Sequence, residues 1–415
     1  MKHYIYFLLT FWLTASSAAA QVASSAEVRT DTILVYQPAN HDSPLQERLN
    51  ALLKTPLAER TLIALYVYDL TDDRPLFAHN HRQTIRPASN MKVITAVAAL
   101  DLLGGDYLFR TLLYADADTQ ADANGTYTGN LYVRAGFDPC FDTTDLKAFV
   151  TALKQEGIRS IQGDFLLDVS IKDTARLGWG WCWDDDAETN PSLTPLPFMG
   201  KNTFTTRLAQ ELQNVGIALK GNIKNGRLPK SENLRLLCER THTIDQILKP
   251  MMKQSDNLYA EALFYQMAAR NGKPYATRKQ GSEHIRTLVE RLGFNASDFT
   301  FADGSGVSLY NYASPELLVA LLRYAWYHRD IYNHLLPALP IAGMDGTLKR
   351  RMTNGHAFQN VQAKTGTVTG ISTLAGYATA PNGHRLCFSI MNSGQQRAAV
   401  AREFQDNVCQ ALTRP

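Results

Sequence analysis

The hydrophobic pattern of the chain is densest over residues 93–100, Val-Ile-Thr-Ala-Val-Ala-Ala-Leu, where nearly every position is apolar. A helix that is apolar on all faces is a buried helix. Gly104-Gly105 follows and is a typical C-terminal stop. The stretch Pro-Ala-Ser-Asn-Met-Lys, residues 87–92, comes directly before it. The pattern therefore predicts a core helix with Ser89 at its N-terminus.

Further periodic segments predict an α/β protein. Leucines between 45 and 53 recur at the spacing of one helix face, and residues 62–70 form an apolar, aromatic run typical of a strand. Residues 372–378 and 385–391 flank a Pro-Asn-Gly turn and predict a hairpin. The last helix, 398–413, carries an apolar stripe that we expect to pack on the sheet, formed by Val400, Phe404, Val408 and Leu412.

The amino-acid composition of the chain changes after the buried helix. Residues 116–129 form a polar stretch rich in Gly, Asp and Thr between two strand-like runs. Ordinary helix and strand patterns return later in this part of the chain. We interpret residues 112–233 as a smaller inserted domain, so that residues 21–111 and 234–415 form the main domain.

The first twenty residues resemble a secretory signal peptide. Lys2 and His3 form a short basic end, Tyr4 to Ala15 are largely apolar, and three alanines precede Gln21. A membrane anchor is the alternative, but the apolar run is short for one, and no later window of about 18 apolar residues predicts a membrane span. We expect residues 1–20 to be removed on export.

Composition excludes some functions. The chain has 415 residues, 45% of them hydrophobic and 20% charged, and a net charge of +3, which argues against a nucleic-acid binder. The five cysteines have no zinc-type spacing, so we expect no structural metal: Cys140, Cys182, Cys238, Cys387 and Cys409. Cys140 and Cys182 could pair, or all five could be free.

Ser89 and Lys92 form a Ser-x-x-Lys pattern that can carry nucleophilic chemistry. A serine hydroxyl needs an adjacent base, and a lysine serves only if burial or a neighbouring cation lowers its pKa. The start of a buried helix offers that burial, together with free backbone N–H groups that can stabilise an oxyanion. Taken alone, the same pattern fits a capping serine beside a solvated lysine.

Two later tripeptides could contribute to the same site. In Ser255-Asp256-Asn257, an extended connector would point Ser255 and Asn257 the same way, although a simple helix cap is the alternative. In Lys364-Thr365-Gly366, strand alternation puts Lys364 and Gly366 on one face. Such a strand could hold an extended peptide with its carboxylate near the lysine, or could be an ordinary edge strand.

Together, the three motifs resemble those of penicillin-binding proteins and class A β-lactamases, in which they occur in this order. More segments narrow the resemblance to class C penicillin-binding proteins, the D-alanyl-D-alanine carboxypeptidases and endopeptidases of the penicillin-binding protein 4 type. These are Gly-Asp-Phe-Leu-Leu-Asp at 163–168, Trp181-Cys182-Trp183-Asp184-Asp185, Ser-Asp-Asn-Leu-Tyr-Ala-Glu at 255–261, Asp303-Gly304-Ser305-Gly306 and Gly343-Met344-Asp345-Gly346-Thr347-Leu348.

The resemblance implies a fold and a reaction. The fold would be a β-lactamase/transpeptidase-like domain, an antiparallel sheet covered by helices plus a helical lobe, with the inserted domain attached. The substrates would be peptidoglycan stem peptides and cross-links, cleaved through an acyl-enzyme in the periplasm without a cofactor or metal. β-Lactam antibiotics would be covalent inhibitors.

The resemblance also implies roles for residues. Ser89 would be the nucleophile and Lys92 its base. Ser255 would relay a proton to the leaving amine, and Asn257 would orient the substrate. Lys364 would attract the terminal carboxylate, with the adjoining strand binding substrate and the N–H groups of Ser89 and Thr367 forming the oxyanion hole; the substrate-binding residues of that strand are Thr365, Gly366 and Thr367.

Two other functions stay open at this point. A β-lactamase would share the acylation step but needs a group for rapid deacylation, and the nearest candidate, Glu290, has the wrong spacing for a class A enzyme. A non-catalytic wall-binding or β-lactam-sensing protein could be built on the same fold. The sequence does not separate carboxypeptidase from endopeptidase action.

Overall fold

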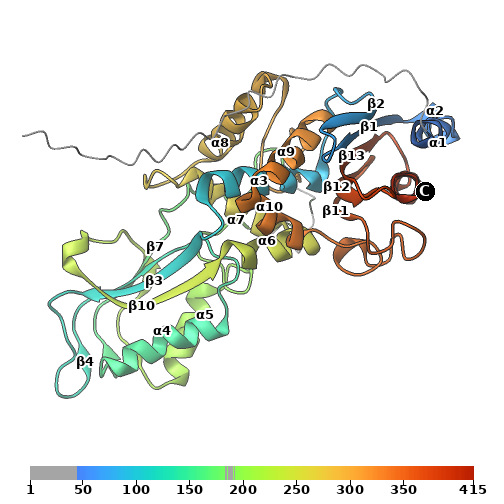
Figure 1. Cartoon of the computed structure of the whole chain (residues 1–415). Helices are drawn as coiled ribbons and strands as arrows, with labels where there is room; N and C mark the ends of the chain where they lie inside the picture. Colours follow the sequence, from blue (N-terminus) through green and yellow to red (C-terminus); the bar gives the residue numbers. More distant parts are fainter. Residues whose placement is uncertain (1–43, 183–184, 186–189, 191) are drawn as a thin grey trace, which may run out of the picture.

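The structure is a computed structural model that describes residues 44–182, 185, 190 and 192–415. The predicted signal peptide and its polar lead-in lie outside these residues, as do Trp183 and Asp184 of the acidic aromatic segment. The described part contains a five-stranded antiparallel sheet, a helical lobe and a second group of sheets with their own helices (Figure 1). No helix among the described residues is both long and apolar enough to cross a membrane.

The first sheet combines strands from an early and a late part of the described chain. Its strand order is β11-β12-β13-β1-β2, and β1 pairs antiparallel with β13 from Leu62 opposite Ser393 to Asp69 opposite Leu386. The predicted C-terminal hairpin is confirmed as β12 and β13. The bounds are β1 Leu62–Asp69, β2 Arg74–His79, β11 Gln362–Val368, β12 Ile371–Thr379 and β13 Arg385–Ser393.

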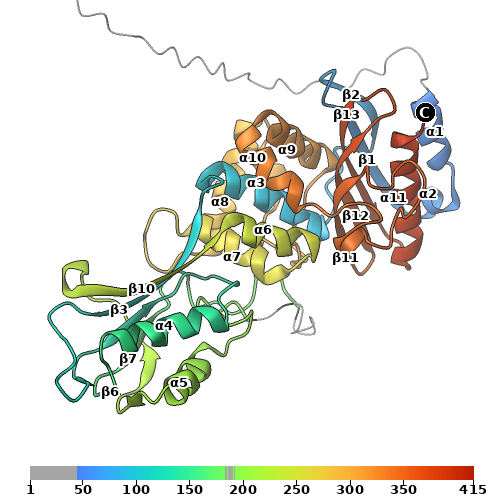
Figure 2. The ribbon, with the colours of Figure 1, turned by 60° about the horizontal axis from the view of Figure 1, so that its bottom comes forward.

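Both faces of this sheet are buried, which explains the continuous apolar run of β1. Ile63, Leu65 and Val67 pack on one side in a cluster with the first and last helices, whereas Tyr66 and Tyr68 face the helical lobe. Figure 2 shows the sheet between these two helical layers. The covering helices are α1 Pro44–Leu52, α2 Pro56–Arg60 and α11 Ala398–Thr413.

The predicted stripe of α11 packs on the sheet at three of its four positions. Phe404, Val408 and Leu412 are buried in the cluster that contains Leu49 of α1. Val400, in the first turn of α11, is 45% exposed. The helix therefore meets the sheet only beyond its first turn.

The helical lobe is built around α3, Met91–Leu103, whose first ten residues are all buried. The predicted core helix is thus confirmed, and its stop is Gly104, which has a φ of 84°. The 3-10 turn η1, Ala88–Asn90, leads into it and carries Ser89. The other helices of the lobe are α6 Ile244–Lys253, α7 Asn257–Ala268, α8 Arg278–Arg291, α9 Pro315–Tyr327 and α10 Arg329–Ala338, with turns η3 Ala296–Asp298 and η4 Gly346–Leu348.

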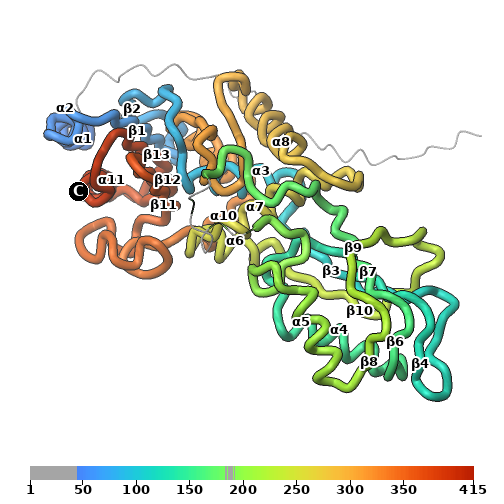
Figure 3. The backbone as a smooth tube through the Cα atoms, turned by 180° about the vertical axis from the view of Figure 1, so that it is seen from behind, coloured from blue at the N-terminus to red at the C-terminus, as the bar shows by residue number. Residues whose placement is uncertain are grey.

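A second sheet has the order β10-β3-β5-β7-β9 and mixes antiparallel and parallel pairs. Helices α4 and α5 cover one of its faces (Figure 3). A small parallel sheet, β4-β6-β8, adjoins it. The bounds are β3 Leu108–Asp116, β4 Thr126–Tyr127, β5 Leu131–Arg134, α4 Thr143–Gln155, β6 Ser160–Ile161, β7 Phe165–Asp168, α5 Phe204–Asn214, β8 Ala218–Leu219, β9 Ile223–Asn225, η2 Ser231–Asn233 and β10 Leu234–Thr243.

The limits of the predicted inserted domain, 112 and 233, stay a prediction. The pairing of β3 with β10 runs outward past both limits, from Asp116 opposite Leu234 to Leu108 opposite Thr243. Residue 112 therefore lies inside β3, and 233 precedes β10 by one residue. Paired strands carry the chain into and out of this region, and a change of composition alone does not reveal where such strands begin and end.

A charged cluster holds the end of β10 to α4 and to the segment before it. His242 Nδ1 lies 2.6 Å from Asp138 Oδ2, and His242 Nε2 lies 3.8 Å from Asp145 Oδ2. Arg240 Nε donates to Asp145 at 2.6 Å. The hydrogen bond to Asp138 raises the pKa of His242, against the opposing effect of burial. One residue later, Thr243 caps α6, so the cluster fixes the connection into the helical lobe.

We expect the stability of the protein to depend on pH through His242. Because its pKa is raised in the folded state, its contribution is fully present below the unfolded pKa of about 6.5 and is lost as pH rises through the folded pKa. Urea unfolding of wild type and His242→Gln at about pH 6 and pH 9 should show the larger difference at the lower pH. His356→Gln, at an exposed loop histidine, is the control. An equal difference at both values would contradict this assignment.

Candidate active site

Ser89 lies on a tightly held turn between the first sheet and α3. Ala88 has a φ of 45°, a left-handed conformation that is rare for alanine. Thr373 Oγ1 donates to the Pro87 carbonyl at 2.9 Å. The Asn90 amide bridges two strands, with Nδ2 donating to the Lys364 carbonyl at 2.8 Å and Oδ1 accepting from the Ala375 N–H at 3.2 Å. Strain next to the serine is thus stabilised by bonds to β11 and β12.

Gly366 of β11 allows this close approach. A Cβ at this position would lie 2.1 Å from Thr373 Oγ1 and 3.0 Å from both the Pro87 carbonyl oxygen and the Ser89 nitrogen. Only a residue without a side chain lets the strand pass so near the Ser89 turn. The backbone of β11 and the N-terminus of α3 are therefore neighbours because of this glycine.

Lys92 lies one turn beyond Ser89 and is completely buried. Its Nζ donates to Ser89 Oγ at 3.1 Å, to Asn257 Oδ1 at 2.6 Å and to the Ser305 carbonyl at 2.7 Å. Burial lowers the pKa of Lys92 to about 8, although the carboxylates of Asp303, Glu261 and Asp256 act in the opposite direction. A lysine of this kind holds a proton and releases it near neutral pH.

Lys364 is the second buried cation. Its Nζ donates to Ser255 Oγ at 2.9 Å and to the Thr365 carbonyl at 2.7 Å. Burial, with the charge of Lys92 as a further cause, holds the pKa of Lys364 well below its usual value. Each lysine is thus paired with one serine hydroxyl: Lys92 with Ser89, and Lys364 with Ser255.

The Ser-Asp-Asn segment lies between these two pairs. Ser255 has a φ of 63°, and Asp256 caps α7 by accepting from the backbone N–H groups of Leu258 (2.9 Å) and Tyr259 (3.4 Å). Ser255 and Asn257 on either side each contact one of the lysines. The two alternatives from the sequence, a helix cap and a shared site, therefore both hold.

The rest of the β11 motif is divided between two faces, as the alternation predicts. Lys364 and Gly366 are buried, whereas the Thr365 hydroxyl donates to Thr347 Oγ1 at 2.7 Å. Thr367 is exposed, and its hydroxyl oxygen accepts from Arg402 at 3.4 Å. The structure brings five of the predicted residues into two hydrogen-bonded groups, Ser89–Lys92–Asn257 and Ser255–Lys364, while the hydroxyls of Thr365 and Thr367 have other partners.

Buried acids behind Lys92 were not predicted individually. Glu261 Oε1 accepts from the backbone N–H groups of Gly304 (3.0 Å) and Ser305 (2.8 Å), which fixes the Ser305 carbonyl on Lys92. Burial raises the pKa of Glu261 to about 8, and the charge of Asp303 contributes. Asp303 accepts from Trp181 Nε1 at 2.9 Å. Glu261 and Asp303 both lie in sequence segments that carry the family resemblance, and that resemblance was the available signal for them.

A hollow of about 960 Å³ opens beside the Ser-Asp-Asn segment. It lies between the start of α7 and the inserted region, from which Pro139, Cys140 and residues 199–202 line it. Its volume suits a peptide of several residues. The hollow therefore reaches Ser255 and Asn257 from the side of the second sheet.

The other candidate sites from the sequence take no part in this cluster. All five cysteines are free thiols, so Cys140 and Cys182 do not pair. Among the described residues, one group of side chains could hold a metal ion, formed by Asp69, Asp72 and His384, and it includes none of the predicted catalytic residues.

With this geometry established, comparison with known proteins decides the family. A family model described as D-Ala-D-Ala carboxypeptidase 3 (S13) matches residues 45–196 and 198–414. The chain belongs to the S13 family. The resemblance inferred from the motifs is thereby confirmed.

Curated S13 relatives match most of the chain. The D-alanyl-D-alanine carboxypeptidase DacB of Haemophilus influenzae is 26% identical over 81% of this chain and 86% of its own. The D-alanyl-D-alanine carboxypeptidase of Actinomadura sp. (strain R39) is 26% identical over 89% of this chain and 85% of its own.

Solved structures share the fold. Penicillin binding protein 4 (dacB) of Haemophilus influenzae has a TM-score of 0.79 at 24% identity, covering 88% of this chain and 99% of that one. The penicillin G-acylated predatory endopeptidase Bd3459 of Bdellovibrio bacteriovorus has a TM-score of 0.57 at 20% identity, covering 85% and 93%. The predicted transpeptidase-like α/β fold is confirmed.

Within this S13 fold, we expect Gly366→Ala to lower the free energy of unfolding by about 1–3 kcal/mol, because the added methyl group must displace β11 or the Ser89 turn. Urea unfolding measures the effect. Gly226→Ala is the matched control, since its Cβ would meet only the side chain of Leu166, at 3.0 Å. Equal stability of Gly366→Ala and wild type would show that the two segments separate without cost.

Proposed function

We propose that this S13 enzyme is a serine D-Ala-D-Ala carboxypeptidase and endopeptidase that acts on peptidoglycan stem peptides and cross-links. The observation that carries the proposal is the pair of fully buried lysines, each within hydrogen-bond distance of a serine hydroxyl. An activated serine with a second protonatable pair beside it suits acyl transfer to water. Two curated D-alanyl-D-alanine carboxypeptidases match over most of the chain.

The acylation step assigns Ser89 as the nucleophile. Its Oγ attacks the carbonyl carbon of the D-Ala-D-Ala bond, and its proton passes to the neutral amine of Lys92. The backbone N–H groups of Ser89 and Thr367 stabilise the negative oxygen of the tetrahedral intermediate. When the C–N bond breaks, Ser255 relays to the leaving amine the proton that Ser89 gave to the lysines, so that Ser255 and both lysines return to their starting protonation. Water then hydrolyses the ester and regenerates Ser89.

Lys364 links substrate binding to this step. Burial lowers the pKa of both lysines. Nearby carboxylates partly offset this effect at Lys92, whereas the charge of Lys92 lowers the pKa of Lys364 further. The amine of Lys364 is therefore the more readily neutral in the free protein. A terminal carboxylate bound against β11 would favour its charged form, and the new cation would in turn favour the neutral form of Lys92. Substrate binding would thus prepare the base.

The carboxypeptidase and endopeptidase reactions share the acyl-enzyme and differ in the leaving amine, free D-alanine or a cross-linked diamino acid. A β-lactamase would need a group that activates water for rapid deacylation. Glu290, the candidate from the sequence, is exposed on α8. This exposure favours a slowly deacylating target of β-lactams. The signal-like N-terminus, residues 1–20, and the wall substrate together support export to the periplasm.

We expect benzylpenicillin to form a long-lived adduct of one molecule per chain at Ser89. Intact mass spectrometry of the mature protein measures it. Ser89→Ala should form no adduct, whereas Ser297→Ala, at an exposed serine of η3, should behave as wild type. Rapid loss of penicillin without an adduct would identify a β-lactamase. Neither adduct nor turnover in the folded protein would leave a non-catalytic binding protein.

We expect the acylation rate to rise with pH up to a plateau above about 8, because Lys92 accepts a proton only when neutral. Lys92→Gln should acylate about 10²–10⁴-fold more slowly and lose this rise. Stopped-flow acylation by benzylpenicillin between about pH 6 and pH 9 tests both. A variant that kept the wild-type profile would assign the base to another group.

A further inference from the structure

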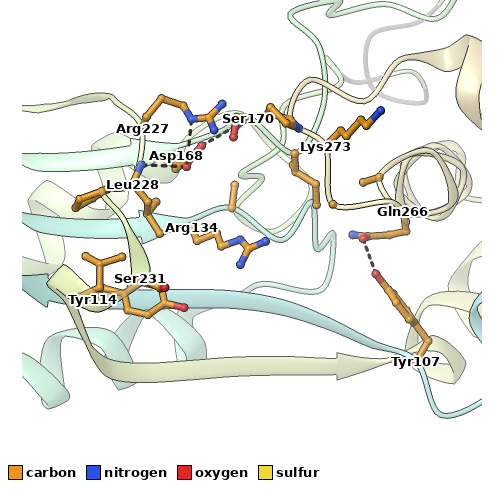
Figure 4. A pocket seen from close by; sticks show the side chains of 17 residues that line it. Tyr107, Tyr114, Arg134, Asp168, Ser170, Arg227, Leu228, Ser231, Gln266 and Lys273 are labelled. Carbon is orange, nitrogen blue, oxygen red and sulfur yellow. Dashed lines mark hydrogen bonds and ion pairs between the residues drawn. The ribbon is translucent and has the colours of Figure 1, made fainter.

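A second hollow, of about 420 Å³, lies between the second sheet and the helical lobe. Figure 4 shows it in close view, with strands of the sheet on one side and α7 on the other. Its walls come from β3, β5, the segments after β7 and β9, and the connection from α7 to α8. None of the residues assigned to catalysis lines it.

The hollow carries an excess of positive charge. Its basic side chains are Arg134, Arg227 and Lys273, and its single acid is Asp168. That carboxylate is already engaged, because Oδ1 accepts from the Ser170 N–H at 3.0 Å and Oδ2 from the Leu228 N–H at 3.1 Å. Arg227 Nε lies 3.8 Å from the same Oδ2. Two cations of the hollow therefore remain without a carboxylate there.

Arg134 is the central cation. It ends β5, and Figure 4 shows its guanidinium projecting into the space between the sheet and α7. Its side chain is exposed, and its guanidinium makes no hydrogen bond or ion pair with any residue that the structure describes. Nearby, burial raises the pKa of the Tyr107 phenol, while Arg270, Arg110 and Arg134 act to lower it.

A guanidinium with its five donors free is suited to a carboxylate, which it binds through two parallel hydrogen bonds. Polar groups that can accept or donate line the same hollow, including the hydroxyls of Ser170 and Ser231. The volume exceeds that of a single small ion and suits a short peptide. The chemistry of the hollow therefore fits an anionic peptide with at least one free carboxylate.

We infer that this hollow, which we name the Arg134 pocket, is a second binding site for the carboxylate-bearing stem peptides of peptidoglycan. The identity of this ligand rests on the proposed function, since the wall polymer that the enzyme cleaves presents many such peptides. Helix α7 connects the two sites: Asn257 at its first residue contacts Lys92, and Gln266, nine residues later, lines the pocket. They lie about 14 Å apart along the helix axis.

A second binding site at this distance would help an enzyme that acts on a polymeric substrate. A neighbouring stem peptide held in the Arg134 pocket would keep the enzyme on the wall while the catalytic site exchanges peptides, as in other bivalent binding. The pocket would not change the chemistry at Ser89. It would raise the efficiency on multi-peptide substrates over that on a single short peptide.

The test separates the pocket from the catalytic site by blocking the latter. The full mature protein is first acylated with benzylpenicillin, and binding of a soluble stem tripeptide with free carboxylates is then measured by isothermal titration calorimetry. We expect one remaining site, which Arg134→Gln weakens by about tenfold or more. Arg159→Gln, at an exposed arginine on the far small sheet, is the matched control and should bind as wild type.

A second readout checks the consequence. Arg134→Gln should hydrolyse a single short D-Ala-D-Ala peptide at the wild-type rate but release D-alanine more slowly from intact peptidoglycan. No binding to the acylated protein, equal binding by Arg134→Gln and wild type, or binding of inorganic phosphate but not of the tripeptide would each overturn the inference. A failure of the proposed function is distinguishable, because benzylpenicillin would then form no adduct in the first step.

Discussion

The site depends on keeping two lysine side chains buried. Removing a charge from water is costly unless hydrogen bonds and opposite charges compensate. For Lys92, three oxygen acceptors and the charge of nearby carboxylates compensate for the lost water. For Lys364, the Ser255 hydroxyl and the Thr365 carbonyl of the same strand do so. The same burial that destabilises the charged forms makes these amines able to exchange protons near neutral pH. Burial of the two lysines is therefore the origin both of the contacts that the fold must supply around them and of their reactivity.

This constraint explains the supporting architecture. Glu261 serves no reacting atom directly, yet it holds the loop whose Ser305 carbonyl accepts from Lys92. Gly366 and Asn90 bring β11 against the Ser89 turn, which places the two lysine–serine pairs in one chamber. The strained backbone at Ala88 and Ser255 lies at both serine positions. Such strain persists only where the surroundings over-determine the conformation.

Much of the main fold could be predicted from local pattern. The all-apolar helix after Ser89 is a strong signal for burial, and strand alternation correctly placed Lys364 and Gly366 on one face. The limits of the inserted domain stay a prediction; the pairing of β3 with β10, which connects this region to the rest, is non-local and leaves no change in composition. Val400 had the right spacing but lies where α11 has not yet reached the sheet. The roles of Glu261 and Asp303 depend on contacts between distant segments, which no spacing encodes.

The pairing of β1 with β13 also affects when the protein can fold. Leu62 and Ser393 are partners at opposite ends of the described chain, and β1 lies in the interior of its sheet. During synthesis, β1 and β2 are made before β11 to β13, so β1 lacks its neighbouring strand until β13 has been made. The catalytic chamber, one wall of which is β11, is also incomplete until then. Contacts of such long sequence separation slow folding, so the first sheet, and with it the site beside β11, is completed late in folding.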